Sequence, residues 1–509
     1  MVQWVPQAPV AVNLRRLFPS ASFVGCGDIR ILYATCRSAE CRPNGLFAVI
    51  RGTRTDGHKY IQEAIARGAT ALLVDHPLAD VSVPQCIVPD VRRAFAELCA
   101  ALAAHPSRHL GLAGVTGTNG KTTTTWLIRS ILHAAAKQTG LLGTIDYSDG
   151  VTTESSTLTT PDAEMLSRWL SAMVSQRTTH AAMEVSSHAL DQRRLAGTLL
   201  DAAVITNITQ DHFDYHQTYE AYRRTKLRMF DYLKPAAPAI INLDDEGSRS
   251  CLADAPKRVM TYGLDHPADV NATILEETLH GSRFRVTLGN ETQVMQTRLV
   301  GRHNVSNCLA AIAVASHFNI SLADIAQGVE ILSAVPGRLE QIDCGQQYHV
   351  FVDYAHTEDA LRRCVQFLRP FAQGRLICVF GAGGDRDKAK RPLLGKAANE
   401  ADVVVVTSDN PRSEDPQAII QDILAGIDGN VSMPHVEVDR QQAIHWALER
   451  ARPGDIVLVA GKGHETEQII GTDRNHFDDR EVVRRYLGTN QSVVGAPHNH
   501  LASRPSISV

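Results

Sequence analysis

Short apolar segments alternate with longer amphipathic ones along most of this chain. In its N-terminal part the pattern predicts strands at 45–50, 71–74 and 85–88 and helices at 60–67 and 91–104. Further on it predicts two sets of buried strands, each followed by helical stretches: 112–115, 179–184, 202–207 and 239–242, then 350–354, 376–380, 403–407 and 456–460. Such alternation is typical of mostly parallel sheets covered by helices. The predicted fold class is therefore α/β.

Two segments with linker chemistry divide the chain. They are Ala-His-Pro-Ser at 104–107 and Val-Pro-Gly-Arg at 335–338, where proline or glycine interrupts the regular pattern. We predict a small N-terminal α/β domain (1–107), a central domain with a mostly parallel sheet (108–335) and a C-terminal Rossmann-like α/β domain (336–490). A length of 509 residues agrees with about three domains. The polar remainder, 491–509, has no periodicity and is expected to be disordered.

Composition and charge restrict the class of protein. Hydrophobic residues make up 44% of the chain and charged residues 21%, with a net charge of −4, which argues against nucleic acid or an anionic membrane as a partner. No run of about 18 apolar residues occurs. The ten cysteines form no Cys-x-x-Cys pair, which favours reduced thiols over a metal or disulfide framework. We expect a cytoplasmic monomer that does not associate with membranes.

The segment 112–124, Leu-Ala-Gly-Val-Thr-Gly-Thr-Asn-Gly-Lys-Thr-Thr-Thr, carries the strongest chemical signal. It reads as a strand end, a glycine-rich turn and a helix at 125–136. Glycines let backbone amides surround a polyphosphate, and the helix N-terminus adds partial positive charge. Lys121 would reach the terminal phosphates and Thr122 would bind Mg²⁺. The segment therefore predicts a P-loop ATPase-like central domain.

The spacing within this loop is unusual. The common phosphate loop has glycine six residues before the lysine, and here that residue is Val115. This unusual spacing reduces the number of protein families to which the chain can belong. The predicted ATP-binding residues of the loop are Gly114, Thr116, Gly117, Thr118, Asn119, Gly120, Lys121, Thr122 and Thr123.

Two further residues of the central section are candidate Mg²⁺ ligands. Glu184 ends an apolar strand, and His212 lies just past the next one. A carboxylate suits Mg²⁺, which needs few protein ligands because phosphates and waters complete its octahedron. From the residues alone, Glu184 could equally cap the following helix, and His212 could be a hydrogen-bonded histidine at a strand end. We interpret His188 and His216 as structural.

Several motifs occur in the order typical of one family. They are Gly-x-x-Gly-x-x-Gly-Lys-Thr (114–122), Glu-Val-Ser-Ser-His (184–188), Asp-His-Phe-Asp-Tyr-His (211–216) and Gly-Arg-His-Asn-Val-Ser-Asn (301–307). With them the chain resembles the Mur ligases, which make UDP-linked peptidoglycan precursors by ATP-driven amide bond formation. The segments at 353–357, 383–388, 409–412 and 461–465 resemble the branch that adds the third residue to UDP-MurNAc-L-Ala-D-Glu. The resemblance covers roughly residues 20 to 488.

The resemblance implies a mechanism and roles for the residues named above. ATP would phosphorylate the terminal carboxylate of the dipeptide, and the incoming amine would attack the acyl phosphate. Lys121 would act at the γ-phosphate, with Mg²⁺ held by Thr122 and Glu184. A second Mg²⁺ would be held by His212 and by Lys226 as a carbamate (N6-carboxylysine). From the sequence alone, Lys226 is an ordinary helix-surface lysine.

The same resemblance implies binding residues for each substrate. Those for the UDP-MurNAc-dipeptide are Arg37, Thr159, Thr160, Ser186, Gln192 and Arg194, although the family's Asp-Ser-Arg appears here as Thr-Cys-Arg at 35–37. Asn304 and Arg338 would lie near ATP. Those for the acceptor amino acid are Arg386, Asp409, Asn410, Pro411, Arg412, Gly461 and Glu465. Taken alone, Thr-Thr-Pro at 159–161 is a loop and Asn-Pro-Arg at 410–412 is a turn with a solvated arginine.

The Asp-Asn-Pro-Arg segment at 409–412 favours meso-diaminopimelate as the acceptor. Diaminopimelate has a distal carboxylate that lysine lacks, and an arginine can bind it bidentately. The alternatives are L-lysine as acceptor, or a related amide ligase of the folylpolyglutamate or D-Ala-D-Ala-adding type. A non-catalytic ATP-binding switch is a further alternative, but such a chain would have no reason to combine Lys226 with acid-recognising arginines in a third domain.

Overall fold

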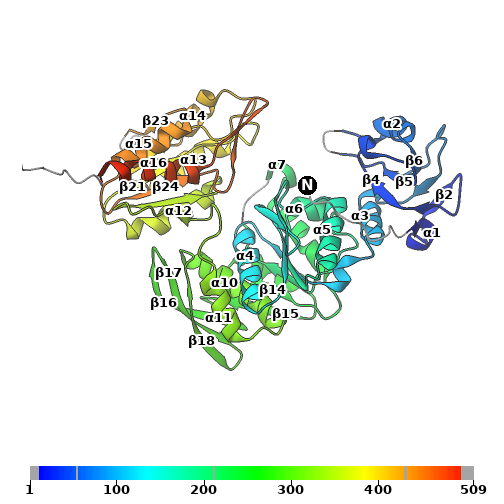
Figure 1. Ribbon diagram of the computed structural model, residues 1–509, viewed down its shortest axis with the longest axis horizontal. Coiled ribbons are helices and arrows are strands. Elements are labelled where there is room, and N and C mark those ends of the chain that lie inside the picture. The colour runs from blue at the N-terminus through cyan, green and yellow to red at the C-terminus, as the bar shows by residue number, and fades with distance from the viewer. Residues whose placement is uncertain (1–10, 53–54, 210–212, 429–432, 495–509) are drawn as a thin grey trace, which may run out of the picture. The chain divides into compact units, whose positions relative to one another are not determined.

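The computed structural model describes residues 11–52, 55–209, 213–428 and 433–494. The chain divides into two units, Met1–Ser333 and Ala334–Val509 (Figure 1). This division lies beside the predicted linker at 335–338, whereas the predicted break at 104–107 lies inside the first unit. Helices pack against the three large sheets, of five, eleven and six strands, which confirms the α/β class.

The N-terminal region of the first unit is built on a five-stranded sheet of order β2-β7-β6-β5-β4. Only β2 is antiparallel to its neighbour. The strands are β2 (Ser22–Val24), β4 (Tyr33–Thr35), β5 (Gly45–Ala48), β6 (Ala69–Val74) and β7 (Gln85–Ile87), with β1 (Val12–Asn13) paired to β3 (Arg30–Ile31). The helices are α1 (Leu14–Leu17), α2 (Ile61–Ala66) and α3 (Val91–Leu102), with 3-10 turns η1 (Ser38–Glu40) and η2 (Gly57–Tyr60).

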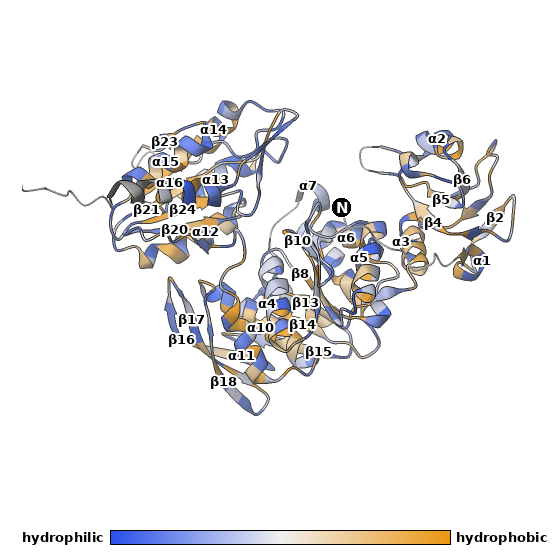
Figure 2. Ribbon diagram, viewed as in Figure 1, coloured by the Kyte–Doolittle hydropathy of each residue, from blue (hydrophilic) through white to orange (hydrophobic). Residues whose placement is uncertain are grey.

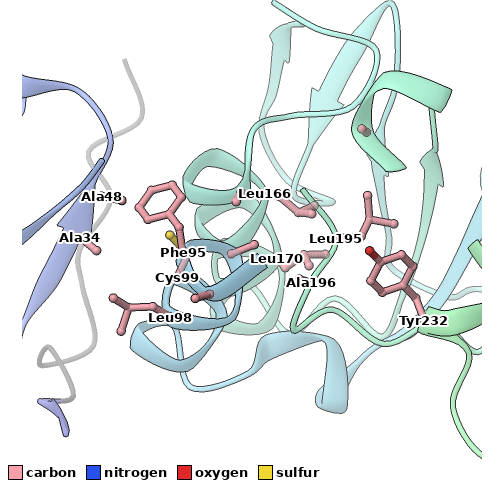
Figure 3. Packing of buried hydrophobic residues seen from close by; sticks show 14 of the residues in the cluster. Ala34, Ala48, Phe95, Leu98, Cys99, Leu166, Leu170, Leu195, Ala196 and Tyr232 are labelled. Atoms are coloured by element: carbon pink, nitrogen blue, oxygen red, sulfur yellow. The ribbon is translucent and has the colours of Figure 1, made fainter. Parts of the chain in front are cut away.

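Helix α3 joins this region to the central sheet. Its buried residues Phe95, Leu98 and Cys99 lie between Ala34 and Ala48 of the N-terminal sheet on one side and Leu166 and Leu170 of α5 (Ala163–Ser175) on the other (Figure 3). One hydrophobic core therefore runs through both parts of the first unit.

The central sheet has eleven strands in the order β11-β10-β9-β12-β8-β13-β14-β15-β16-β17-β18. The strands from β9 to β16 are parallel, and antiparallel strands extend both edges. Their bounds are β8 (Gly111–Thr116), β9 (Thr139–Leu142), β10 (Asp146–Ser148), β11 (Thr153–Ser155), β12 (His180–Glu184), β13 (Ala202–Ile205), β14 (Ala239–Asn242), β15 (Val259–Gly263), β16 (Val270–Thr278), β17 (Gly281–Leu288) and β18 (Glu291–Thr297). All four strands predicted for this section are confirmed.

The helices of the central section include one whose start differs from the prediction. Helix α4 (Lys121–Ala134) begins four residues before the predicted start at 125, because Gly120, with φ of 84°, is its N-cap. The other helices are α6 (Ser187–Asp191), α7 (Phe213–His216), α8 (Tyr219–Leu227), α9 (Glu246–Arg249), α10 (Arg302–His317) and α11 (Leu322–Ile331), with 3-10 turns η3 (Pro106–His109), η4 (Arg228–Tyr232) and η5 (Ser250–Asp254).

The second unit is a six-stranded sheet of order β19-β20-β24-β21-β22-β23, parallel except for β19. Its middle strands β24 and β21 are buried throughout and hydrophobic (Figure 2). The strands are β19 (Glu340–Gln341), β20 (His349–Asp353), β21 (Leu376–Phe380), β22 (Val403–Val406), β23 (His435–Val436) and β24 (Ile456–Ala460), and the hairpin is β25 (Glu467–Ile470) with β26 (Asp473–His476).

The helices of this unit are α12 (Glu358–Leu368), α13 (Lys390–Ala398), α14 (Pro416–Leu424), α15 (Arg440–Arg450) and α16 (Asp479–Val494), with the 3-10 turn η6 (Arg369–Phe371). Helix α16 extends four residues beyond the predicted domain end at 490. No helix in the described residues is long and apolar enough to cross a membrane.

Candidate active site

The glycine-rich loop joins β8 to α4 and is folded around the side chain of Lys121. The Lys121 ammonium donates to the carbonyls of Gly117 (2.9 Å) and Thr118 (2.8 Å). Gly117 has φ of 154°, and a Cβ there would lie 1.9 Å from the Thr206 hydroxyl. The loop therefore requires glycine at this position for both its backbone conformation and its packing.

Residues after β13 hold the other side of the loop. The Thr206 hydroxyl donates to the Asn119 carbonyl (2.6 Å), and the Asn119 amide donates to the Asn207 side chain (2.8 Å). These two residues follow a strand that lies beside β8 in the sheet. Thr206 and Asn207 were not predicted as site residues, because a threonine and an asparagine at the end of a strand match no recognisable binding motif.

Glu184 lies beside the loop because of sheet register. Strand β12 pairs with β8 so that Glu184 is opposite Val115. Its carboxylate, fully buried, accepts from the Thr122 hydroxyl (3.0 Å) and from the amide (2.7 Å) and hydroxyl (2.9 Å) of Thr144. The helix-cap interpretation of Glu184 is wrong, because Ser186 caps α6 by accepting from the amide of Ala189.

Lys226 is buried, so its interpretation as a helix-surface residue is wrong. Only 1% of it is exposed. Its ammonium donates to the Gly117 carbonyl (2.8 Å) and lies 3.5 Å from the Thr116 hydroxyl and 4.5 Å from the ring centre of Tyr222. Helix α8 thus brings a lysine directly against the phosphate loop. His212, the other predicted ligand of the second metal, lies outside the described residues.

Four of the residues predicted to hold the dipeptide form a connected group next to Glu184: Thr160, Ser186, Gln192 and Arg194. Arg194 donates to the Thr160 carbonyl (2.6 Å) and to the Gln192 side chain (2.9 and 3.2 Å). The Thr160 hydroxyl donates to the Glu184 carbonyl (2.8 Å) and accepts from the amide of Ser186 (2.9 Å). The pKa of Arg194 is lowered by burial.

This group and the phosphate loop line one pocket of about 270 Å³. Its lining residues are Gly117, Lys121, Leu158, Thr159, Thr160, Ser186, Ser187, His188, Arg194, Tyr222 and Lys226. Two residues predicted to bind phosphate, Gly117 and Lys121, and an arginine predicted to bind the dipeptide, Arg194, therefore open into the same space. The two histidines that we interpreted as structural are close by: His188 lines the pocket, and His216 is hydrogen-bonded to the Ser187 hydroxyl (2.9 Å).

Arg37 is not among the lining residues. Its guanidinium is ion-paired with Glu40 (2.7 Å), Asp162 (3.3 Å) and Glu164 (3.5 Å). Two of these carboxylates belong to the cap and first turn of α5 in the central section. Arg37 therefore connects the N-terminal region to the start of α5, which follows the pocket residues Thr159 and Thr160 in the chain.

The two residues predicted to lie near ATP outside the loop have different settings. Asn304, buried in α10, donates to the Val300 carbonyl (2.8 Å) and accepts from Asn307 (3.0 Å). The Asn307 side chain in turn accepts from the Thr124 hydroxyl of α4 (3.4 Å). Arg338 belongs to the second unit, where its guanidinium lies 4.7 Å from the ring centre of Tyr354.

In the second unit, the predicted acceptor residues meet at the carboxyl ends of β22 and β24. Asn410 donates to the Glu465 carboxylate (2.8 Å), and a Cβ on Gly461 (φ of 115°) would lie 2.7 Å from the Asp409 carboxylate. Lys462, fully buried, donates to Asn410 (3.1 Å) and Glu465 (3.3 Å). Lys462 was not predicted as a site residue, because the sequence around a single lysine does not indicate whether its side chain is buried.

Arg412 is half-buried and not a solvated turn residue. It has φ of 52°, and its guanidinium donates to the Gly384 carbonyl (2.6 Å). Burial and the nearby Arg386 guanidinium lower the pKa of Arg412. Arg386 itself is exposed. Two guanidinium groups in one place favour an anionic ligand.

A buried ion pair contacts the carboxyl end of β24, one of these two strands. Arg440 and Asp479, both fully buried, form a bidentate contact (2.7 Å for each bond). Arg440 also donates to the Ala460 carbonyl (2.9 Å), immediately before Gly461. This contact orients the backbone that carries the predicted acceptor residues.

Family models match the chain in three consecutive segments. "Mur ligase family, catalytic domain" matches residues 31–104, "Mur ligase middle domain" matches 115–315, and "Mur ligase, glutamate ligase domain" matches 337–463. The chain belongs to the Mur ligase family. The match to the Mur ligase middle domain begins in β8, the strand that precedes the phosphate loop.

Two Mur ligases with a specific name are similar to the chain over most of its length. The UDP-N-acetylmuramoyl-L-alanyl-D-glutamate--2,6-diaminopimelate ligase of Geobacillus thermodenitrificans is 44% identical over 466 residues, covering 90% of this chain and 95% of the relative. The enzyme of that name from Gloeobacter violaceus is 45% identical over 470 residues, covering 91% and 95%. Both similarities extend over nearly the whole chain.

Solved structures of Mur ligases are similar in fold to this chain. A structure of a UDP-N-acetylmuramoyl-L-alanyl-D-glutamate--2,6-diaminopimelate ligase has a TM-score of 0.67 and 32% identity, covering 95% of this chain and all of that one. MurF ligase from Thermotoga maritima in complex with ADP has a TM-score of 0.61 at 18% identity, covering 91% and 98%, and shares the fold.

Proposed function

We propose that this Mur ligase joins meso-2,6-diaminopimelate to UDP-N-acetylmuramoyl-L-alanyl-D-glutamate at the expense of ATP, in peptidoglycan precursor synthesis. The observation that carries the proposal is the pocket in which Lys121 and Gly117 of the phosphate loop face Thr159, Thr160 and Arg194. A ligase of this type must bring a carboxylate to the terminal phosphate of a nucleotide. The names of the similar enzymes support the choice of substrates.

In the proposed first step, the dipeptide carboxylate attacks the γ-phosphate of ATP and ADP leaves, which yields an acyl phosphate. Lys121 would move from the Gly117 and Thr118 carbonyls to the phosphates and neutralise their charge. Such catalysis depends on positioning and on charge stabilisation. Arg194, held by Thr160 and Gln192, would orient the acidic substrate beside the loop.

The residues next to the loop fit a magnesium ion. The Thr122 hydroxyl and the Glu184 carboxylate, 3.0 Å apart, are hard oxygen donors of the kind that Mg²⁺ prefers. When bound, Mg²⁺ supplies neutralisation of phosphate charge. A carbamate on Lys226 would add an anionic oxygen group at the Gly117 side of the pocket, where the unmodified ammonium now lies.

In the second step, the acceptor amine attacks the acyl carbon, and the tetrahedral intermediate releases phosphate to leave an amide. Arg412 and Arg386 would bind the distal carboxylate of diaminopimelate. Their guanidinium groups are close enough for Arg386 to lower the pKa of Arg412, and two neighbouring cations attract an anion. Glu465, which is already bonded to Asn410 and Lys462, would bind the distal ammonium. Lysine lacks the distal carboxylate and would leave both arginines without an anionic partner.

The test is phosphate release with defined substrates. The proposal predicts release only when ATP, UDP-MurNAc-L-Ala-D-Glu and diaminopimelate are all present, with a UDP-MurNAc-tripeptide of the expected mass and far slower release with L-lysine. Equal rates with lysine would contradict the acceptor assignment. ATP turnover without either substrate, and no tripeptide, would contradict the ligase itself.

A further inference from the structure

The N-terminal region contains a group of nitrogen and oxygen donors away from the pocket described above. His58 belongs to η2, and Asp75 and His76 follow β6 directly. Their ligand atoms all lie within 4.8 Å of one another. Because Asp75 and His76 stand at the carboxyl end of a parallel strand, they occupy the edge where α/β sheets bind ligands. We propose that these three residues bind a divalent transition-metal ion, with Zn²⁺ as the best fit.

Asp56 holds the ring of His58 in one orientation. The carboxylate of Asp56 lies 2.6 Å from Nδ1 of His58 and also accepts from the backbone amide of His58 (3.0 Å). A carboxylate at Nδ1 keeps the proton on that nitrogen and leaves a lone pair on Nε2. Metal-binding histidines are commonly held in this way by a carboxylate behind the ring. His58 is thus prepared to act as a ligand through Nε2.

The lone pair on Nε2 of His58 lacks a partner within the described residues. Nε2 of His58 is buried and makes no hydrogen bond there. The Asp75 carboxylate lies 3.9 Å from it, which is too far for a hydrogen bond. A buried polar atom without a partner is unfavourable. A metal ion between Nε2 and the carboxylate would satisfy both groups.

The residue types in this group and its exposure to solvent both favour a transition-metal ion. Asp75 uses one oxygen for Nδ1 of His76 (2.5 Å) and the other for Arg51 (3.4 Å), so one oxygen faces the histidines. Two imidazoles with one carboxylate favour Zn²⁺, Co²⁺ or Ni²⁺ over Mg²⁺ or Ca²⁺, which prefer oxygen ligands. The side chain of His76 is 50% exposed. Three protein ligands and an open side leave room for a water as the fourth ligand.

The test uses Co²⁺ as a spectroscopic probe on the full-length, chelator-treated protein in saturating Mg²⁺. We expect absorption of a tetrahedral, imidazole-bound Co²⁺ that Zn²⁺ displaces. Glu184→Gln, which removes the candidate Mg²⁺ ligand in the central section, should leave this spectrum unchanged. His58→Gln and His76→Gln should abolish it. Asp56→Asn should weaken Zn²⁺ binding about 10- to 100-fold, as loss of a carboxylate behind a ligating histidine does.

Two controls keep the outcomes distinct. His109→Gln removes another exposed histidine, on η3, and should not change the spectrum. Because His58→Gln could disturb folding, its thermal unfolding is compared with that of His76→Gln, whose side chain is largely solvated. Absence of Co²⁺ absorption in the wild type, or a spectrum lost in Glu184→Gln but kept in His58→Gln, would overturn the proposal. Neither outcome depends on ligase activity.

Discussion

At the scale of single residues, Lys226 is the most unusual side chain of the candidate site. It is a buried lysine whose ammonium donates to the carbonyl of Gly117. Burying an ammonium costs free energy, which hydrogen bonds and opposite charges must offset. The proposed role is to carry a carbamate, which converts the cation into an anionic oxygen ligand.

Replacement of Lys226 tests this role. Lys226→Ala should lose ligase activity, and added short carboxylic acids should restore part of it by supplying the missing oxygens. Lys226→Arg keeps the positive charge but cannot be carbamylated, so it should be inactive and should not respond to the acids. Activity is measured as phosphate release with all three substrates. An active Lys226→Arg enzyme would show that a cation alone is sufficient.

Arg412 is the residue on which acceptor selectivity should depend. Arg412→Ala should raise the KM for diaminopimelate about 10- to 100-fold, since a hydrogen bond to a charged group contributes about 1.5–3 kcal/mol. The KM for ATP should change little. Arg412→Lys should restore only part of the loss, because lysine cannot form a bidentate contact.

Steady-state kinetics with each substrate varied in turn measures this effect. Arg363→Ala is the matched control, because Arg363 is a half-exposed arginine of the same unit, paired with Asp359 on α12. Equal increases in both KM values for Arg412→Ala would refute the assignment.

At the scale of elements, the phosphate loop depends on the close approach of Gly117 to Thr206. Gly117→Ala should raise the KM for ATP at least about tenfold, because its Cβ would lie 1.9 Å from the Thr206 hydroxyl and overpacking of this kind costs about 1–3 kcal/mol. Gly289→Ala is the control: its φ is also positive (56°), but nothing lies within 4 Å of the added Cβ. It should leave the KM for ATP unchanged. Similar KM values in both variants would show that the contact does not shape the loop.

The loop after Arg412 should make the stability of the second unit dependent on pH. The Arg391 guanidinium (2.8 Å) and then the Asp385 amide (2.6 Å) hold the pKa of Glu414 at about 2, below its ordinary value. A carboxyl whose pKa is lowered in the folded state stabilises it above the unfolded pKa. This stabilisation should therefore be lost as the pH falls from about 4.5 towards about 2.

Urea unfolding at several pH values, followed by hydrogen exchange of peptides from 334–509, measures this dependence. Glu414→Gln should be less stable than the wild type at neutral pH, and the difference should shrink across the acidic range. A difference that is constant with pH would mean that the contact acts through shape alone.

At the scale of the whole molecule, the two halves of the proposed reaction depend on different units. Lys121 of the phosphate loop and four of the residues predicted to hold the dipeptide line a pocket within the first unit. The predicted acceptor residues belong to the second unit, as does Arg338, which is predicted to lie near ATP. The acyl phosphate should therefore form without diaminopimelate. Hydroxylamine should trap it as a hydroxamate when ATP and UDP-MurNAc-L-Ala-D-Glu are supplied. Arg412→Ala should give as much hydroxamate as the wild type, and Lys121→Ala none. Hydroxamate that forms only when the acceptor is present would contradict this division.

The fold and much of the candidate site could be predicted from the sequence. Buried strands such as β8 and β12 follow from uninterrupted apolar runs, and the phosphate loop follows from Gly117, Gly120 and Lys121. The start of α4 was placed too late, because the pattern of apolar residues does not show that Gly120 serves as a helix cap. Local signals of this kind predict an element better than its ends.

The amino-acid sequence by itself determined the local properties: which segments are strands, which loop has the residues of a phosphate loop, and which family the motifs resemble. Only the tertiary structure decided that Glu184 faces Thr122 and does not cap α6, that Lys226 is buried against Gly117, and that Lys462 supports Asn410 and Glu465. The reason is physical. Hydrophobic periodicity reports the conformation and burial of neighbouring residues, whereas these contacts join segments far apart in the chain, and they depend on which strands become neighbours in the sheet and in which register.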